Sequence, residues 1–319
     1  MAIGVDRVQL RKSERTALGG DDADIGEMGE PTPIAPQEDA IEVAGVYFQD
    51  ETDQDENVAI YRDNGKAYVK DVAHPDGIVL ARSTKGHRSG LLITVSANAR
   101  VDVGVGLARD STDVMDLELT SADSALITSS GAGGLDTGSE AADTWYAIHI
   151  IGDTSGVNSE DLLLSLSSTA PTMPSGYDVF RHIGWTRNSS SSHFHRYREV
   201  REGWVQYDIS RNTGRVLNGG TATIYTDVDT SDLVPVDSSL ALCNINLNTS
   251  VDSSYIRFRG GDFDTTSIVN QHRPGLATGS SRQQGTVFIP LDSSQVFEYE
   301  CSTADISADV YVAGYVSTL

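Results

Sequence analysis

The chain has 319 residues, and its 46 acidic side chains outnumber 23 lysines and arginines, which leaves a formal net charge of −23 at neutral pH. This charge repels phosphate backbones, so we expect no nucleic-acid partner. No apolar run approaches the roughly 20 residues of a membrane-spanning helix, so we expect no membrane insertion. Helical periodicity is nearly absent, while glycine, serine, threonine and aspartate are abundant, which predicts an all-β fold with many turns.

Residues 1–40 are predicted to form an extended anchoring arm. Residues 19–40, GGDDADIGEMGEPTPIAPQEDA, combine glycine, proline and acids with almost no apolar periodicity. Such a segment cannot bury enough apolar surface to order itself alone, so we expect other chains to hold it. The opening segment also lacks the apolar core of a secretion signal.

Residues 41–82 are predicted to form a small β unit. Two strand-like segments, NVAIYRD and KAYVKDV, flank Asn64-Gly65, a dipeptide that signals a two-residue hairpin. Asp53 begins an acidic run, DQDEN, that is similar to the start of a calcium loop, but Val58 stands where that loop needs glycine. We therefore favour an exposed acidic loop and predict no metal site.

Residues 83–203 are predicted to form a β-sandwich module. Short strand candidates recur at a spacing of about ten residues, as in sandwiches and jelly rolls. The segment TWYAIHII, residues 144–151, alternates between two faces and is rich in aromatic and β-branched residues, which predicts a strand. Pro171, Pro174 and Gly176 then interrupt the pattern before an extended stretch resumes.

Residues 204–319 contain a second series of strand candidates, which is enough for a second sandwich. The expected fold class is therefore all-β, with two β-sandwich (jelly-roll-like) domains, an extended N-terminal arm and a small β unit. Cys243 and Cys301 lie in two of these strand candidates, at a spacing that fits no zinc or redox motif. We favour two buried free thiols, and a single disulfide between strands of this domain is the alternative.

The final strand candidate is largely apolar on both faces. A strict alternation would put Val310, Val312, Gly314 and Val316 on one face and Tyr311, Ala313 and Tyr315 on the other. Both faces should therefore be dry, one against the core and one against a neighbouring subunit.

A basic cluster stands out in the otherwise acidic chain. The residues that we expect to form ion pairs or an oligomer contact are Arg181, His193, His195, Arg196 and Arg198. In a strand, His193 and His195 would share one face and Phe194 would occupy the other. We favour ion pairing, either with the acidic arm of a neighbour or with Glu199 and Glu202. A metal shared by the histidines around a threefold axis is the alternative.

Aromatic and arginine side chains gather near the end of the chain. Tyr255, Arg257 and Arg259 should share one strand face because side chains alternate along a strand. Aromatic and guanidinium groups are favoured anchors of interfaces. We therefore predict a binding surface whose residues are Tyr255, Arg257, Arg273 and Arg282. The alternative is that these residues fill the subunit interface of an oligomer.

Signatures of enzymes are missing from the sequence. It contains no GxSxG elbow, no Walker loop and no HExxH motif, so we predict no catalytic residue and no cofactor. A pair of carboxylates for glycan cleavage leaves no motif of its own, so a surface-glycan hydrolase stays open as an alternative.

A series of short motifs runs in order through residues 108–184. They are ARDST at 108–112, GGLDTG at 133–138, TWY at 144–146, STAP at 168–171, PSGY at 174–177 and RHIG at 181–184. Together they resemble a recurrent module of tail-fibre and related appendage proteins of tailed bacterial viruses, over roughly residues 90–205. That family usually has Arg-Arg before Ile-Gly, whereas this chain has Arg181-His182.

The resemblance implies a structural virion protein and not an enzyme. It implies a fibre or spike that is attached through residues 1–40 to other virion proteins and displays residues 204–319 outward, where they could bind a host surface glycan or protein. The implied oligomer is a homotrimer, and the implied location is the extracellular particle, assembled in the host cytoplasm. A non-adhesive capsid decoration, collar or tail-baseplate component is the alternative of the same class.

Overall fold

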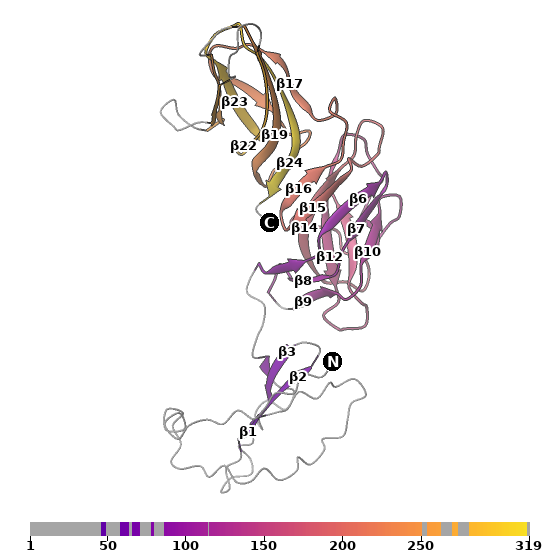
Figure 1. The fold of residues 1–319 in the computed structure, drawn as a ribbon. Coiled ribbons are helices and arrows are strands. Elements are labelled where there is room, and N and C mark those ends of the chain that lie inside the picture. Colours follow the sequence, from indigo (N-terminus) through magenta and orange to yellow (C-terminus); the bar gives the residue numbers. More distant parts are fainter. Residues whose placement is uncertain are drawn as a thin grey trace, which may run out of the picture. The chain divides into compact units, whose positions relative to one another are not determined.

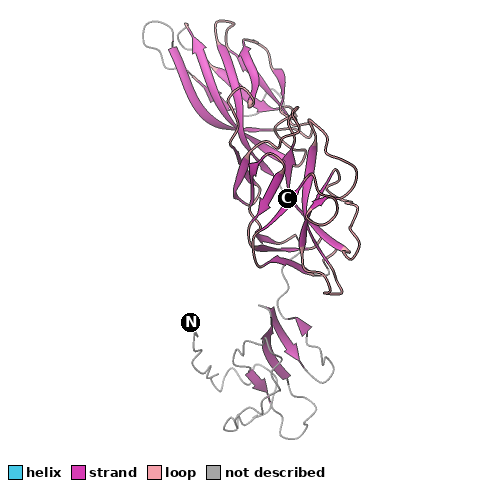
Figure 2. Ribbon diagram, turned by 90° about the vertical axis from the view of Figure 1, so that its right-hand side faces the viewer, coloured by secondary structure: helices cyan, strands magenta, loops and turns pink. Residues whose placement is uncertain are grey.

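The computed structural model describes four short strands before residue 80 and residues 86–113, 115–250, 254–262, 270–273 and 281–317. The chain divides into two compact units, Met1–Ser83 and Thr84–Leu319. The predicted arm, residues 1–40, lies outside the described residues. Every regular element that is described is a strand, so the fold is all-β as predicted (Figure 2). No helix in the described part of the chain is long and apolar enough to cross a membrane.

The first unit contains one antiparallel sheet in the order β1-β2-β3-β4. Its strands are β1 (Val46–Phe48), β2 (Val58–Asp63), β3 (Lys66–Lys70) and β4 (Ile78–Val79). β2 and β3 pair with Asp63 opposite Lys66, which is the register expected of the predicted two-residue hairpin. All four strands lie within residues 41–82, where the sequence predicts a small β unit.

The second unit is built around one large antiparallel sheet of nine strands (Figure 1). Eight of them follow the order β10-β7-β6-β15-β16-β24-β19-β22, and β17 pairs with β24 beside this path. In chain order they are β6 (Ile93–Ala97), β7 (Arg100–Val103), β10 (Asp123–Leu126), β15 (Tyr197–Arg201), β16 (Trp204–Tyr207), β17 (Arg215–Gly220), β19 (Ser238–Thr249), β22 (Ser281–Pro290) and β24 (Ser307–Ser317).

Three smaller sheets complete the second unit, in the orders β11-β13-β12-β14, β18-β23-β20-β21 and β5-β8-β9. The first contains β11 (Gly134–Leu135), β12 (Trp145–Gly152), β13 (Asp161–Ser165) and β14 (Val179–Arg187). The second contains β18 (Thr226–Asp229), β20 (Ile256–Gly260), β21 (Asn270–His272) and β23 (Val296–Cys301). The third contains β5 (Arg88–Gly90), β8 (Gly106–Arg109) and β9 (Asp116–Leu119).

The first sandwich packs sheet β11-β13-β12-β14 against the β10-β7-β6-β15 part of the large sheet. Ile148 and Ile150 of β12 are buried in the same apolar cluster as Ile93 and Val101 of the large sheet. The sheets approach closely at Gly184 of β14, where a Cβ atom would lie 2.3 Å from Ile93 Cδ1. A larger residue at this position would require the buried Ile93 side chain to move.

The second sandwich packs sheet β18-β23-β20-β21 against the β24-β19-β22 part of the large sheet. Cys243 and Leu247 of β19 share its apolar core with Phe258 of β20 and Phe297 of β23. The two phenylalanine rings meet edge to face with their centres 5.9 Å apart. Cys243 and Cys301 are both buried free thiols, which confirms the preferred prediction over the disulfide.

The two sandwiches share the large sheet. The division that we predicted between residues 83–203 and 204–319 falls in the turn between β15 and β16, two strands that pair Arg198 with Gln206. β16 then pairs with β24, so the sheet continues from one sandwich into the next (Figure 1). Both sandwiches accordingly belong to the single compact unit Thr84–Leu319.

A β-bulge changes the faces of β24. The register between β19 and β24 shifts between Leu242 and Cys243. Tyr315 consequently lies in the core together with Val310 and Val312, and all three are at most 2% exposed. The predicted alternation, which separated Tyr315 from these valines, is therefore wrong in this part of the strand, because one extra residue in a bulge reverses the pleat.

Candidate functional site

The predicted binding residues lie mainly around β20 and β21 of the second sandwich. Ile256 and Phe258 of β20 are fully buried, whereas Tyr255 and Arg257 are partly exposed. This alternation follows from the two-residue period of a strand. Arg273 directly follows the edge strand β21, which pairs with β20, and its side chain is exposed.

Tyr255, Arg257 and Arg273 are in contact and are called the Tyr255 cluster below. Arg257 Cζ lies 4.4 Å from the centre of the Tyr255 ring, and Arg273 Cζ lies 5.8 Å from the same centre. Both distances allow cation–π attraction. Arg257 Nε also donates a hydrogen bond to Gln271 Oε1 at 3.0 Å. The structure therefore brings three of the four predicted binding residues together.

Arg282, the fourth predicted residue, belongs to a different sheet. Its backbone lies on β22 of the large sheet, opposite Asn248 of β19. Its side chain lies outside the described part of the structure. The strand order therefore separates Arg282 from the sheet that carries the Tyr255 cluster.

A second stack on the same sheet joins Arg259, which was predicted on the strand face of Arg257, to Tyr225, which the prediction did not include. Arg259 Cζ lies 3.6 Å from the centre of the Tyr225 ring, and Arg259 Nε donates to Glu298 Oε2 at 2.6 Å. No comparable ion pair of Arg257 or Arg273 occurs among the described residues. On this sheet, Arg257 and Arg273 thus form no ion pair among the described residues, although Glu300 of β23 lies opposite Arg257 in the strand register. Tyr225 precedes β18, and nothing in its local sequence signals this contact.

The predicted basic cluster does not form one face. His193 is exposed, whereas Phe194 and His195 are both buried, at 3% and 9% exposure. The predicted common face of the two histidines is wrong, because β15 begins only at Tyr197 and the preceding residues are not part of a strand. Burial lowers the pKa of His195. No group of three or more possible metal ligands occurs in the described residues.

The arginines of this cluster make contacts within the chain. Arg196 forms an ion pair with Asp208 at 3.2 Å. Arg198 Nη2 donates to Gln206 Oε1 at 3.0 Å, and Arg181 Nη2 donates a longer bond of 3.4 Å to a backbone carbonyl. These arginines thus have partners other than the two glutamates that we expected.

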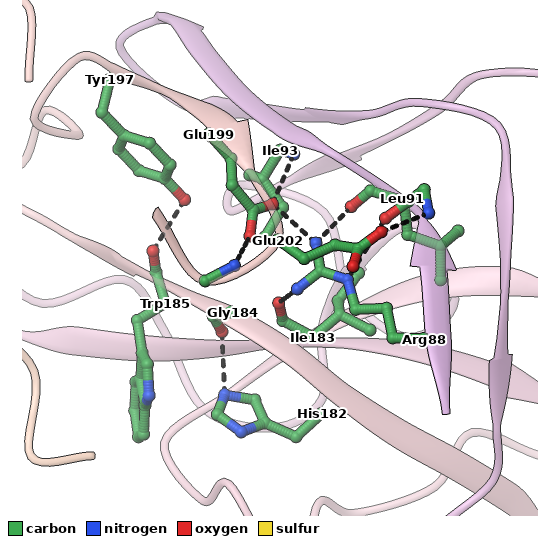
Figure 3. A network of polar contacts seen from close by, with 12 residues as sticks. Arg88, Leu91, Ile93, His182, Ile183, Gly184, Trp185, Tyr197, Glu199 and Glu202 are labelled. Carbon is green, nitrogen blue, oxygen red and sulfur yellow. Dashed lines mark hydrogen bonds and ion pairs between the residues drawn. The ribbon is translucent and has the colours of Figure 1, made fainter. Parts of the chain in front are cut away.

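Glu199 instead belongs to a buried network that ties β5 to the large sheet (Figure 3). Arg88 Nη2 lies 2.6 Å from Glu199 Oε2, and the two side chains are only 8% and 2% exposed. Glu199 also accepts hydrogen bonds from the backbone N–H groups of Ile93 at 3.0 Å and Gly203 at 2.5 Å. Arg88 in turn donates to the carbonyl of Ile183. A buried charge is tolerated only with such partners, so this network serves the fold.

The motif residues between 108 and 184 also stabilise local structure. Asp110 of ARDST accepts a hydrogen bond from the backbone N–H of Met115 at 2.6 Å. Asp136 of GGLDTG accepts from the Ser165 hydroxyl at 2.7 Å and from the backbone N–H of Thr172 at 2.9 Å. These carboxylates accept hydrogen bonds from N–H and hydroxyl groups in turns and at strand ends, as aspartate commonly does in turns.

Two further histidines are buried on β12 and β14. The rings of His149 and His182 lie 5.4 Å apart, and the Trp185 ring lies 4.9 Å from His182. The pKa of each histidine is lowered to about 4, mainly by burial; His182 contributes to the shift of His149, and Arg181 and Arg88 contribute to that of His182. Both are therefore neutral at pH 7, with each Nε2 at 2.9 Å from a backbone carbonyl, those of Ser167 and Gly184.

The described surface thus separates two uses of polar residues. The motif residues and buried ion pairs hold the sheets in place, whereas the Tyr255 cluster presents arginine and aromatic groups to solvent. No protein-family model matches the chain, and a search among curated proteins found no match either.

Proposed function

We propose that the protein is a structural protein of a tailed-virus particle, a compact fibre or spike attached through residues 1–40. The observation that carries this proposal is the ordered series of motifs in residues 108–184, which resembles the appendage module of such viruses. The turn-stabilising roles of Asp110 and Asp136 support it, because they give the motif residues a reason to recur in a sandwich of this kind.

The Tyr255 cluster is the proposed site of host recognition. Arg257 and Arg273 lie beside one aromatic ring and form no ion pair among the described residues. In a chain of net charge −23, such a site attracts acidic groups selectively. Guanidinium groups bind carboxylates and phosphates with two parallel hydrogen bonds. The proposed ligand of this cluster is therefore an acidic group of the host surface.

A homotrimer is the proposed assembly. Phe288 on the outer face of β22 is 39% exposed, and its ring centre lies 5.5 Å from that of Trp204 on β16. Aromatic residues are enriched at protein interfaces, so this pair is the proposed contact with another subunit. The mass of the purified full chain in solution tests this proposal. A trimer is expected, and a stable monomer at micromolar concentration would contradict it.

The virion assignment is tested on intact particles. An antibody raised against the folded full chain is applied to purified particles of the virus that carries the gene, and labelling is located by electron microscopy. We expect label at an appendage of the particle. If the chain is expressed during infection but is absent from purified particles, the assignment is wrong.

A non-adhesive role as a decoration, collar or baseplate component is the second candidate. It is favoured by the motif carboxylates of Asp110 and Asp136, whose contacts serve turns and strand ends of the fold. Adding purified full chain to susceptible cells before infection separates the two roles. Reduced adsorption supports the adhesive role, and unchanged adsorption with correctly assembled protein supports the second candidate.

A further inference from the structure

A cavity of about 270 Å³ opens on the outer face of the large sheet, on the other side of the second sandwich from the Tyr255 cluster. The residues of its lining that matter here are Arg211, Asn246, Gln284, Asp309 and Tyr311, and they are called the amide platform below. None of them belongs to the binding surface predicted from the sequence.

Three adjacent strands supply the floor of the amide platform. Ile245 and Leu247 of β19 are buried, so the intervening Asn246 faces outward. Asn246 lies opposite Gln284 of β22 on one side and opposite Asp309 of β24 on the other. The resulting row of polar side chains spans two strand spacings, about 10 Å. This length suits an extended small ligand.

The fold gains little from these amides. Asparagine is depleted in strands, where threonine and other β-branched residues are favoured. The side chains of Asn246 and Gln284 form no hydrogen bond with any other described residue. By contrast, Asn244 on the same strand accepts a hydrogen bond from Thr286 Oγ1 at 2.8 Å. Residues that break a local preference without serving the fold are a mark of functional sites.

The remaining residues give the amide platform a fixed wall. Arg211 comes from the turn between β16 and β17, and its Cζ lies 4.2 Å from the centre of the Tyr311 ring. Tyr311 is only 8% exposed beneath it. Asp309 Oδ1 accepts a hydrogen bond from the backbone N–H of Gly219 at 2.8 Å. The carboxylate and the guanidinium are therefore held in position before any ligand arrives.

The chemistry of the lining selects an uncharged ligand. Among the residues that line the cavity, the carboxylate of Asp309 is offset by the guanidinium of Arg211, so the site is nearly neutral in a chain of net charge −23. Side-chain amides both donate and accept hydrogen bonds, as hydroxyl groups do. Its volume of about 270 Å³ lies at the small end of the range of small-molecule pockets, so the cavity suits a small ligand.

We propose that the amide platform binds an uncharged saccharide of one or two sugar units. Adjacent hydroxyl groups of a sugar can pair with Asn246, Gln284 and Asp309 along the row, while the Arg211 side chain closes one end. This site is separate from the Tyr255 cluster, and saccharide binding by the isolated chain does not depend on the virion assignment.

The test uses the purified full chain. It is screened against neutral oligosaccharides of glucose, galactose, mannose and N-acetylglucosamine, with sialylated and phosphorylated sugars as the acidic arm, and the binders are titrated by calorimetry. We expect saturable binding of at least one neutral saccharide. The Asn246→Thr/Gln284→Thr double variant should weaken that binding at least tenfold, and threonine should preserve the strands.

Two further variants keep the test decisive. Gln206→Thr changes an exposed amide on β16 of the same sheet, outside the cavity, and should bind like the wild type. Arg211 lies in a turn, so Arg211→Ala removes one wall of the cavity and leaves the strands unchanged. This variant should weaken the binding of the neutral saccharide, and it still tests the proposal if the double variant does not fold. Binding of acidic sugars alone, no neutral binding at millimolar concentration, or neutral binding that Arg211→Ala retains would each overturn the proposal.

Discussion

Arg88 of the first sandwich and the Arg257–Arg273 pair of the second show two opposite uses of arginine. In the first, Arg88 is buried with Glu199 at 2.6 Å and donates to backbone carbonyls, so its charge is fully used inside the protein. In the second, Arg257 and Arg273 stand beside Tyr255 on an outer face, without an ion pair among the described residues. A buried charge needs its partners for the fold, while an exposed one can engage another molecule.

The difference teaches that residue type alone does not identify a binding site. Glu199 has a raised pKa because burial outweighs the attraction of Arg88, which marks the pair as costly to the fold. Such a pair contributes little net stability when intact but is damaging when broken. The four predictions below test the contrast, in order of decreasing effect.

The largest effect is expected from Glu199→Ala. The substitution leaves the guanidinium of Arg88 buried without its carboxylate, and it should lower the free energy of unfolding by about 3–5 kcal/mol. Urea denaturation of the full chain measures the change. Asp102→Ala is the control, because the Arg100–Asp102 pair is 52% and 31% exposed and should contribute less than about 1 kcal/mol. Equal losses in the two variants would contradict the contrast between buried and exposed charges.

The second effect is acid destabilisation through the histidines of the first sandwich. The folded pKa of His149 is about 4, below the ordinary 6.5, so the unfolded chain binds a proton that the folded chain excludes. Stability is therefore complete above pH 6.5 and decreases as the pH falls toward 4, by about 3 kcal/mol for His149. The charges nearby are Asp136, which opposes the shift, and Arg181 and Arg88, which act on His182.

Chemical denaturation between pH 4 and 7 checks this dependence. His149→Gln removes the titrating group while keeping a polar side chain near the carbonyl of Ser167. The variant should show a shallower loss of stability over this range than the wild type. An unchanged slope would show that other groups cause the acid sensitivity.

A smaller effect is expected from Gly134→Ala in the GGLDTG motif. A Cβ at this position would lie 2.4 Å from the backbone oxygen of Ser129, so β11 must shift, at a cost of about 2 kcal/mol. Gly138→Ala in the same motif is the control. Its φ of +80° strains an alanine by about 1 kcal/mol, but no atom lies within 4 Å of the added Cβ. Thermal unfolding compares the two, and a larger loss at Gly138 would refute the packing role of Gly134.

The smallest effect on stability should come from Arg257→Ala with Arg273→Ala. Since both groups lie near the surface and form only exposed cation–π contacts with Tyr255, the free energy of unfolding should change by no more than about 1 kcal/mol. Binding of the full chain to susceptible cells should nevertheless be lost. A stable double variant that still binds these cells would remove the Tyr255 cluster from the proposed function.

The local sequence determined the fold class, the faces of several strands and one hairpin. The two-residue period of the strands predicted the all-β class and the outward position of Tyr255 and Arg257, because alternation on a strand is a property of the backbone. The hairpin at Asn64-Gly65 agrees with the pairing of Asp63 and Lys66, because turn geometry depends on neighbouring residues. The burial of Cys243 and Cys301 as thiols followed from their apolar strand segments.

Contacts between distant segments were decided only by the tertiary structure. The bulge opposite Cys243 moved Tyr315 into the core, and no local pattern records which strand will pair there. The partner of Glu199 is Arg88, which is 111 residues away in the sequence. The amide platform likewise exists only where β22, β19 and β24 align Gln284, Asn246 and Asp309. A sequence specifies each residue's face on its strand, but the register between strands specifies its neighbours.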